Sequence, residues 1–336
     1  MNYSSRFFLY APFALLLAIA AVVGMQWWFA ADALGKQLDA MNAREAMPGV
    51  TIRFAARSIG GFPFNLDAVF RDFRVTVATP HGPARWRAEH FALHALTYGR
   101  DETIFEAAGK QSLGWTDMKG RVHELPFETG SLHASAIESV GALSRFDLDI
   151  VGFGSPALTA TRLQFHIRHV TNGNRLDVFA SGDDIHLSPS LHGAFGDEVK
   201  LVALQGSIGA ASTFDELRAG RADWHGAVEA WRKASGTLHA DPFEVGWGKL
   251  DMVGRGSASL DDTHRPRGLL DFKITGLTDW LAHSAPSHPG GIAAALRDRA
   301  AKAGANEAGR MGAVLGARDG IVYLGDEPAG IVTPLY

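Results

Sequence analysis

One uninterrupted apolar run near the N-terminus constrains this chain most. Residues Phe7–Ala31 contain no Asp, Glu, Lys or Arg. A helix of about 25 residues extends about 37 Å, enough to cross roughly 30 Å of hydrocarbon with some tilt. Trp27 and Trp28 lie near the end of the run, where indole rings favour the headgroup region. We therefore expect residues 1–31 to form a membrane anchor, inserted through residues 7–31.

The charges beside this run predict its direction. Arg6 and the α-amino group precede it, whereas Asp32 and Asp39 follow it, with Lys36 between them. The positive-inside rule then places the N-terminus in the cytoplasm and residues 32–336 in the periplasm, as in a single-pass inner-membrane protein. The alternative is a signal peptide cleaved near Ala31-Asp32-Ala33. Because the apolar region of a signal peptide spans only ~7–15 residues, we favour a retained anchor.

Composition excludes several classes of function. The chain has no Cys, which rules out disulfides, thiolate zinc sites and a Cys nucleophile. Its net charge of −4 includes no basic block, which argues against nucleic acid as a partner. About 305 residues follow the anchor, enough to build a large hydrophobic core.

Two kinds of periodicity divide the rest of the chain. Residues 32–47 carry Leu34, Leu38 and Met41 at helical spacing, which predicts a juxtamembrane helix that ends at Pro48-Gly49. Residues 48–336 mostly alternate apolar and polar residues and contain no low-complexity linker. This pattern predicts a single β-rich periplasmic domain.

Within this domain, alternation marks the strands and two dipeptides mark irregularities. Strands are expected over Phe62–Phe70, Arg85–Thr97, Ser144–Ile150, Arg162–Val170, Arg175–Leu187, Glu198–Ile208, Leu250–Leu260 and Gly268–Gly276. The alternation changes phase at Arg71-Asp72, which indicates a bulge or tight turn. Asn172-Gly173 is typical of a hairpin turn. With helical segments near 214–233 and 277–305, these patterns predict a mainly β fold with a long, curved, largely antiparallel sheet.

A series of short motifs carries a resemblance to a known family. The order of these motifs is Gly60–Leu66, Leu163–Arg168, Leu176–Gly182, Trp231–Leu238 and Asp319–Gly325. It resembles the alphaproteobacterial membrane-anchored family catalogued as domain of unknown function 2125, and the resemblance spans nearly the whole chain. The family implies no particular activity. It is loosely similar in architecture to AsmA-like envelope proteins, whose open sheets are discussed as apolar grooves that handle lipid. This chain is short beside the long members, which argues against a bridge across the envelope.

Motifs for catalysis and metal binding are weak. The chain has 14 His residues, but His90 and His94 would lie about 13 Å apart on one strand, too far for a shared ion. His166 and His169 would point to opposite faces of a strand. The sequence contains no Gly-x-Ser-x-Gly elbow and no Walker-type phosphate loop. We therefore predict no catalytic residue, no metal site and no cofactor, and we expect a protein that is not an enzyme.

One motif is the candidate for a structural or lipid-contact role: Gly60, Gly61, Phe62, Pro63 and Phe64. In the structural interpretation, the glycines allow a sharp turn, Pro63 stiffens an edge, and the two Phe rings fill the core. In the functional interpretation, the Phe rings touch lipid near the membrane. The structural interpretation is the one we favour from the sequence.

Three functional hypotheses follow. The leading one is an envelope protein of unknown precise role that binds lipid or another apolar ligand in a concave β-sheet, which requires an apolar face left open. The alternative is a non-enzymatic structural or interaction module that recruits envelope protein partners. A hydrolase would require a pocket that joins a His, an acid and a Ser within hydrogen-bond reach.

Overall fold

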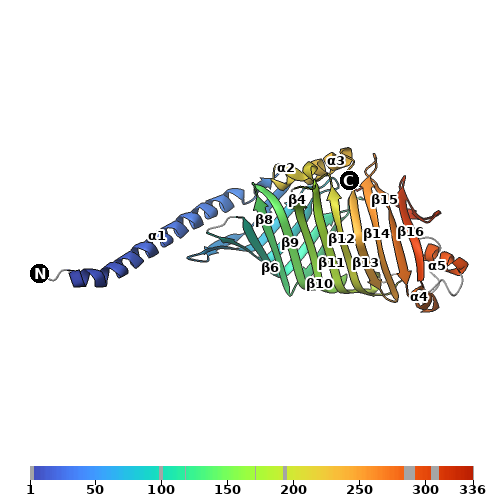
Figure 1. Ribbon diagram of the computed structural model, residues 1–336, viewed down its shortest axis with the longest axis horizontal. Helices are drawn as coiled ribbons and strands as arrows, with labels where there is room; N and C mark the ends of the chain where they lie inside the picture. The colour runs from blue at the N-terminus through green and yellow to red at the C-terminus, as the bar shows by residue number, and fades with distance from the viewer. Residues whose placement is uncertain are drawn as a thin grey trace.

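The protein consists of one long helix and one large antiparallel sheet with a few short helices packed against it (Figure 1). The computed structural model describes residues 4–97, 101–117, 119–170, 172–191, 195–283, 292–303 and 310–335. The expected mainly β fold with a few helices is confirmed.

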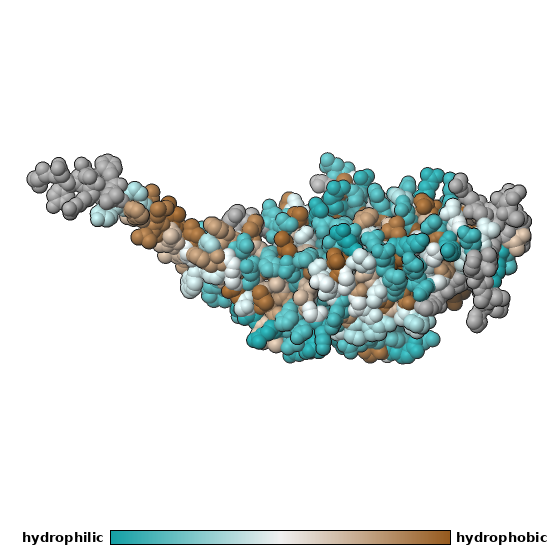
Figure 2. All heavy atoms as spheres, turned by 90° about the horizontal axis from the view of Figure 1, so that it is seen from below, coloured by the Kyte–Doolittle hydropathy of each residue, from teal (hydrophilic) through white to brown (hydrophobic). Residues whose placement is uncertain are grey.

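The N-terminal helix α1 (Ser4–Met41) continues unbroken through the apolar run for 38 residues. At 1.5 Å per residue it is about 57 Å long. Its segment Tyr10–Met41 is long and apolar enough to cross a membrane, and none of its most apolar window is buried inside the protein. Figure 1 shows α1 projecting away from the sheet, and Figure 2 shows its exposed apolar surface. This window gains nothing from the protein's own core, so its apolar side chains require another apolar environment.

The predicted juxtamembrane helix over residues 32–47 is only partly present. The helix ends at Met41, and strand β1 (Arg44–Met47) follows and pairs antiparallel with β2 (Val50–Arg53). Pro48-Gly49 therefore forms the turn of a hairpin, and the prediction that it ends a helix is wrong.

Asn42 and Ala43 account for the early end of the helix. Ala43 has φ of 60°, a left-handed conformation that stops the helical hydrogen-bond pattern. The Asn42 side chain accepts a bond from the Phe54 N–H at 3.0 Å and donates to the Phe54 carbonyl at 3.2 Å. These bonds turn the chain into the sheet, an effect that helical periodicity alone does not reveal.

The remaining strands follow one another as a meander. They are β3 (Ala56–Gly60), β4 (Asn65–Val77), β5 (Ala84–Leu96), β6 (Glu102–Thr116), β7 (Val122–Glu128), β8 (Ser131–Ser139), β9 (Ala142–Gly154), β10 (Leu158–Val170), β11 (Arg175–Leu187), β12 (Glu198–Gly209), β13 (Leu238–Trp247), β14 (Leu250–Leu260), β15 (Pro266–Thr275), β16 (Arg310–Arg318), β17 (Ile321–Leu324) and β18 (Glu327–Ile331). Every strand pairing is antiparallel, and β2 and β3 share the same side of β4. Within the described residues, no register pairs β18 with the β1–β3 edge, so the sheet is open.

Alternation, interrupted by a few β-bulges, gives the sheet one apolar face and one polar face. In one register row, Leu148, Phe165, Ala180, Leu204 and Phe243 lie opposite one another across β9 to β13. We call the face that carries this row the apolar face and its opposite the polar face. The change of phase predicted at Arg71-Asp72 is also present. Asp72 has φ of 51°, and β4 continues through it with Phe70 and Phe73 both buried.

Helices cover parts of the apolar face. The predicted segment 214–233 contains the 3-10 turn η2 (Ala211–Phe214), α2 (Asp215–Arg218) and α3 (Trp224–Lys233). The predicted segment 277–305 contains α4 (Leu277–His283) and α5 (Ile292–Ala303), whereas residues 284–291 and 304–305 lie outside the described part. A further 3-10 turn, η1 (Pro189–Leu191), lies between β11 and β12.

The buried side chains form three clusters, each beneath one helical element. The first lies under the end of α1 and centres on Phe54, Phe70, Phe73 and Phe91. The second packs α2 and α3 against β11, and the third packs α4 and α5 against β14 to β18. The turn between β1 and β2 meets the α2–α3 loop, where a Cβ on Gly49 would lie 3.6 Å from the Cβ of Asp223. The sheet therefore curves around its apolar face, as the N-terminal strands behind the central ones show (Figure 1).

Candidate functional site

The middle of the apolar face is left partly open between the three helical covers. Phe146, Leu148, Phe165 and Leu204 are only half-buried there, and Val202 is 39% exposed. The fully buried apolar side chains of the sheet gather instead beneath α1, α3 and α5. Exposed apolar patches are a common feature of ligand-binding and interaction surfaces.

A pocket of about 270 Å³ lies on the same face beside this strip and shares Leu204 with it. Its lining is almost entirely apolar and comes from the six neighbouring strands β12 to β17, with Leu204, Leu238, Leu270, Leu315 and Val322 among the lining residues. Because these side chains come from distant parts of the sequence, only the register of the sheet brings them together.

Two glycines leave only backbone atoms at the bottom of this pocket, which we call its floor. Gly256 and Gly268 lie among the lining residues on the adjacent strands β14 and β15. A Cβ on Gly256 would lie 2.4 Å from the carbonyl oxygen of Leu269, and a Cβ on Gly268 would lie 2.1 Å from that of Ser257. No side chain fits at either position without a shift of the backbone, so the close approach of these strands depends on glycine.

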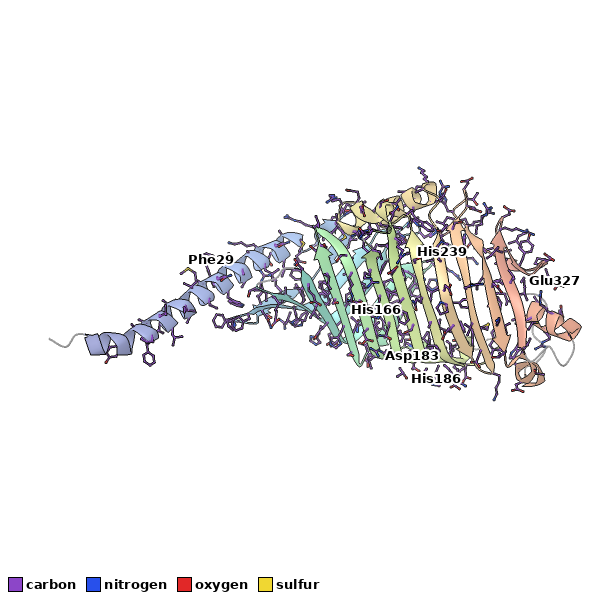
Figure 3. All side chains as sticks on the ribbon, in the orientation of Figure 1. Phe29, His166, Asp183, His186, His239 and Glu327 are labelled. Atoms are coloured by element: carbon purple, nitrogen blue, oxygen red, sulfur yellow. The ribbon has the colours of Figure 1, made fainter. Side chains whose placement is uncertain are left out.

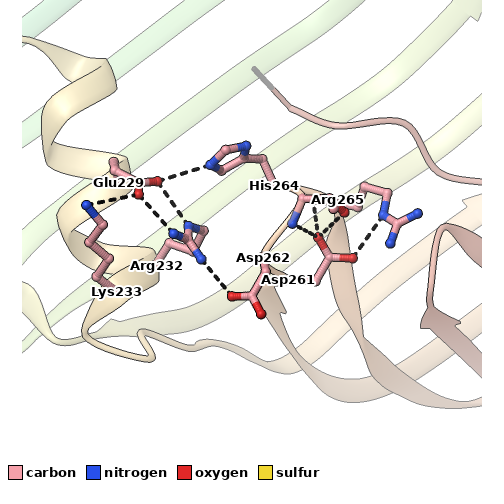
Figure 4. Close-up of polar contacts among 8 residues, drawn as sticks. Glu229, Arg232, Lys233, Asp261, Asp262, His264 and Arg265 are labelled. Carbon is pink, nitrogen blue, oxygen red and sulfur yellow. Dashed lines mark hydrogen bonds and ion pairs between the residues drawn. The ribbon is translucent and has the colours of Figure 1, made fainter.

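An ion-pair network fixes α3 over one end of the apolar face (Figure 4). The Arg232 guanidinium donates to both carboxylate oxygens of Glu229, at 3.0 and 2.9 Å, and to Asp262 at 3.0 Å. His264, in the β14–β15 turn, lies 3.1 Å from Glu229. The hydrogen bonds that Arg232 donates to Glu229, together with the negative charges of Glu229 and Asp262, raise the pKa of Arg232 above its usual value. The network ties α3 to the turn between β14 and β15 and so holds the helix over this end of the apolar face.

The Gly60–Phe64 motif forms the turn between β3 and β4, beside α1. Gly61 has φ of 91°, which suits the predicted sharp turn. The expected strand starts only at Asn65, so Phe62 and Phe64 lie outside it. They are 61% and 57% exposed, and the interpretation that both rings fill the core is wrong. The buried side chains of this segment start instead at Leu66.

A second, polar cleft of about 550 Å³ lies on the other face, over β9 to β13. His166 (Figure 3) lies 2.6 Å from Asp147, and Arg145 also pairs with Asp147 at 2.6 Å. Burial raises the pKa of Asp147, but the hydrogen bonds from His166 and Arg145 outweigh this effect and keep the pKa below its ordinary value. The Ser135 hydroxyl donates to Asp147, at 3.4 Å. In a hydrolytic triad the Ser would instead bond to the His, so this cluster has the wrong order for acyl transfer.

The histidines considered as metal ligands serve as partners of acids or lie apart. His94 is 2.8 Å from Asp67, with Glu106 at 3.8 Å from its other ring nitrogen. His90 lies beside Glu89 at 3.9 Å. Among the residues that the structure describes, no group of three or more His, Asp or Glu side chains could hold a metal ion.

Sequence reasoning identified none of the residues that line the apolar pocket. The strand predicted over Arg162–Val170 is present within β10, and Leu163, Phe165 and Ile167 share one of its faces. The missing signal was the pairing register, since it decides which half-buried positions become neighbours across strands.

Comparison with known proteins identifies the family. The sequence model of a family described as uncharacterized protein conserved in bacteria (DUF2125) matches residues 27–332. No curated protein matches the chain. The matched region starts near the end of the apolar run and includes every strand of the sheet. Because the match covers most of its length, this chain belongs to the DUF2125 family of bacterial proteins.

Proposed function

We propose that this protein is a membrane-anchored envelope protein, not an enzyme, that holds a lipid or another apolar ligand on the apolar face of its sheet. The single observation that carries the proposal is the partly open apolar strip with the pocket of about 270 Å³ beside it. A pocket lined almost wholly by apolar side chains offers an acyl chain a favourable environment and offers little to a charged substrate.

The position of the sheet next to a membrane helix supports a lipid as the ligand. α1 is apolar, exposed and long enough to cross a bilayer. We propose that its N-terminus lies in the cytoplasm and the sheet in the periplasm, as the charges at Arg6, Asp32 and Asp39 favour. A groove beside the inner membrane would then have lipid as the most abundant apolar ligand.

Two adjacent residues of β16 provide the test. Leu315 lines the apolar pocket, and Val314 lies on the polar face next to it. The full-length protein and the variants Leu315→Gln and Val314→Gln would be purified in mild detergent. Native mass spectrometry and lipid extraction would then measure the bound phospholipid.

We expect stoichiometric phospholipid on the wild-type protein and on Val314→Gln, and a several-fold loss on Leu315→Gln. Lipid that surrounds α1 would be equal in all three proteins, so the comparison isolates the pocket. Equal lipid content in the two variants would contradict the proposal. Protein that carries no phospholipid but copurifies with a stoichiometric protein partner would instead favour an interaction module.

A further inference from the structure

The turn between β3 and β4 combines exposure with an absence of charge. The segment Ser58–Leu66 contains no Asp, Glu, Lys or Arg. Phe62 and Phe64 project from it and are more than half exposed. A Cβ on Gly61 would lie 2.7 Å from the Asn65 carbonyl oxygen, so the turn is tight and directs both rings outward. Two exposed Phe rings on a turn are costly in water and favourable in a bilayer.

This turn packs directly on α1. The Phe62 and Trp27 rings meet edge to face, with centroids 5.5 Å apart. The Trp27 indole N–H donates to the carbonyl of Asn65 at 2.7 Å. At Gly24 the helix has no side chain, and a Cβ there would lie 3.8 Å from the Phe62 ring. The turn therefore lies against the same part of the helix that carries the interfacial tryptophans.

The position of this contact along α1 sets its depth in a membrane. Trp27 lies eight residues after Ile19, the middle of the apolar run, which corresponds to about 12 Å along the helix axis. The hydrocarbon half-thickness of a bilayer is about 15 Å. If α1 spans the membrane, Phe62 therefore lies at the boundary between hydrocarbon and headgroups, where aromatic rings are favoured.

The charged residues on either side of the turn already have partners. Arg57 donates to Asp39 at the end of α1, and Asp67 bonds to His94 at 2.8 Å. Their pairing lowers the cost of bringing this part of the sheet close to lipid.

We infer that the turn Gly61–Phe64 is a second membrane contact. It inserts Phe62 and Phe64 into the leaflet from which α1 emerges toward the sheet. This inference rests on the membrane anchoring by α1 proposed above. With α1 and this turn both in the bilayer, the sheet keeps a fixed orientation relative to the membrane. An attachment through α1 alone would leave that orientation free to vary. The occupant of the exposed Phe surface is the lipid bilayer itself.

The absence of Cys allows a direct test with single-Cys probes in the full-length chain. The positions are Phe64 in the turn, Leu17 in α1 and Leu269 on the polar face of β15, which are 57%, 71% and 64% exposed. Each variant, Phe64→Cys, Leu17→Cys or Leu269→Cys, would carry an environment-sensitive fluorophore. The proteins would be reconstituted into vesicles of phosphatidylcholine and phosphatidylglycerol that contain brominated lipid as a quencher.

We expect strong quenching at Leu17→Cys and Phe64→Cys and several-fold weaker quenching at Leu269→Cys. Quenching at Leu17→Cys together with a Phe64→Cys signal as weak as that of Leu269→Cys would overturn the second contact and leave the anchor intact. Absence of quenching at Leu17→Cys would overturn the anchor and this inference together. Because Phe64 is exposed, its label leaves the core undisturbed, and near-ultraviolet circular dichroism would confirm the fold of each variant.

Discussion

Arg57 on β3 donates two parallel hydrogen bonds to the carboxylate of Asp39 in the last turn of α1. Its Nε lies 2.8 Å from Oδ1 and its Nη2 lies 2.5 Å from Oδ2. The same Nη2 group donates to the Gly35 carbonyl at 2.9 Å, and Gly35 leaves room for the guanidinium because it has no side chain. The Arg57 hydrogen bond keeps the pKa of Asp39 below its ordinary value. This bidentate contact joins the end of α1 to the sheet.

Removal of this contact is expected to loosen the end of α1. In the variant Arg57→Gln, the amides of residues 33–41 should exchange with deuterium several-fold faster than in the wild-type protein. The reason is that the helix end loses the bidentate hydrogen bonds from the Arg57 guanidinium. Hydrogen exchange read by mass spectrometry would measure this. Lys36→Gln is the control, since its exposed pair with Asp32 on the same helix contributes little. Equal exchange in the two variants would show that packing alone holds the helix end.

The aromatic cluster under α1 is expected to carry much of the stability. Phe70 is 1% exposed, with ring centroids of Phe54, Phe73 and Phe91 within 5.0, 5.4 and 5.9 Å. Phe70→Ala should lower the free energy of unfolding by about 3–5 kcal/mol. The neighbouring Val69 is 42% exposed, so Val69→Ala should change it by no more than about 0.5 kcal/mol. Chemical denaturation of the full chain in detergent would test both values.

The pair of Asp147 and His166 should make stability depend on acid pH. The pKa of Asp147 in the folded protein is below its ordinary value of 3.8. Its stabilising contribution is therefore complete above about pH 5 and is lost as the pH falls toward the folded value, because protonation then favours the unfolded chain. Asp147→Asn should reduce the slope of unfolding free energy against pH between about pH 5 and 3. A slope as steep as that of the wild-type protein would assign the acid sensitivity to other carboxylates.

The attachment of α3 to the apolar face should depend on Arg232 more than on Lys233. Arg232 bonds both Glu229 and Asp262, whereas Lys233 makes one contact to Glu229 at 3.3 Å and is 68% exposed. We expect Arg232→Gln to increase protease cleavage and amide exchange across Trp224–Lys233, and Lys233→Gln to leave both near the wild-type level. The reverse ranking would contradict the role given to the network.

Replacement of Gly256 in the pocket floor by Ala should lower stability, whereas the same replacement of Gly312 on the polar face should not. Gly256→Ala forces a Cβ to within 2.4 Å of a backbone oxygen and should cost about 1–3 kcal/mol of unfolding free energy. Gly312, on β16, has nothing within 4 Å of an added Cβ. Gly312→Ala should be neutral or stabilising by up to about 1 kcal/mol. Denaturant midpoints of the two variants would decide whether close strand approach explains Gly256.

Local sequence patterns predicted most of the elements but not their ends. The helical spacing of Leu34, Leu38 and Met41 was correct up to Met41, where the side-chain bonds of Asn42 to the Phe54 backbone ended the helix. Alternation also extended the first long strand back to Phe62, although this ring belongs to a turn against Trp27. Both errors arise where a contact with a distant segment overrides a local preference.

The sequence by itself determined the long apolar helix and the antiparallel, β-rich body. An uncharged run of this length requires an apolar environment, and a two-residue alternation requires a sheet with two unlike faces. Only the tertiary structure decided which apolar positions stay open, which glycines lie in the pocket floor, and that Phe62 and Phe64 lie outside the core. These properties depend on pairing register and on helices that cover the sheet, both of which join residues far apart in the chain.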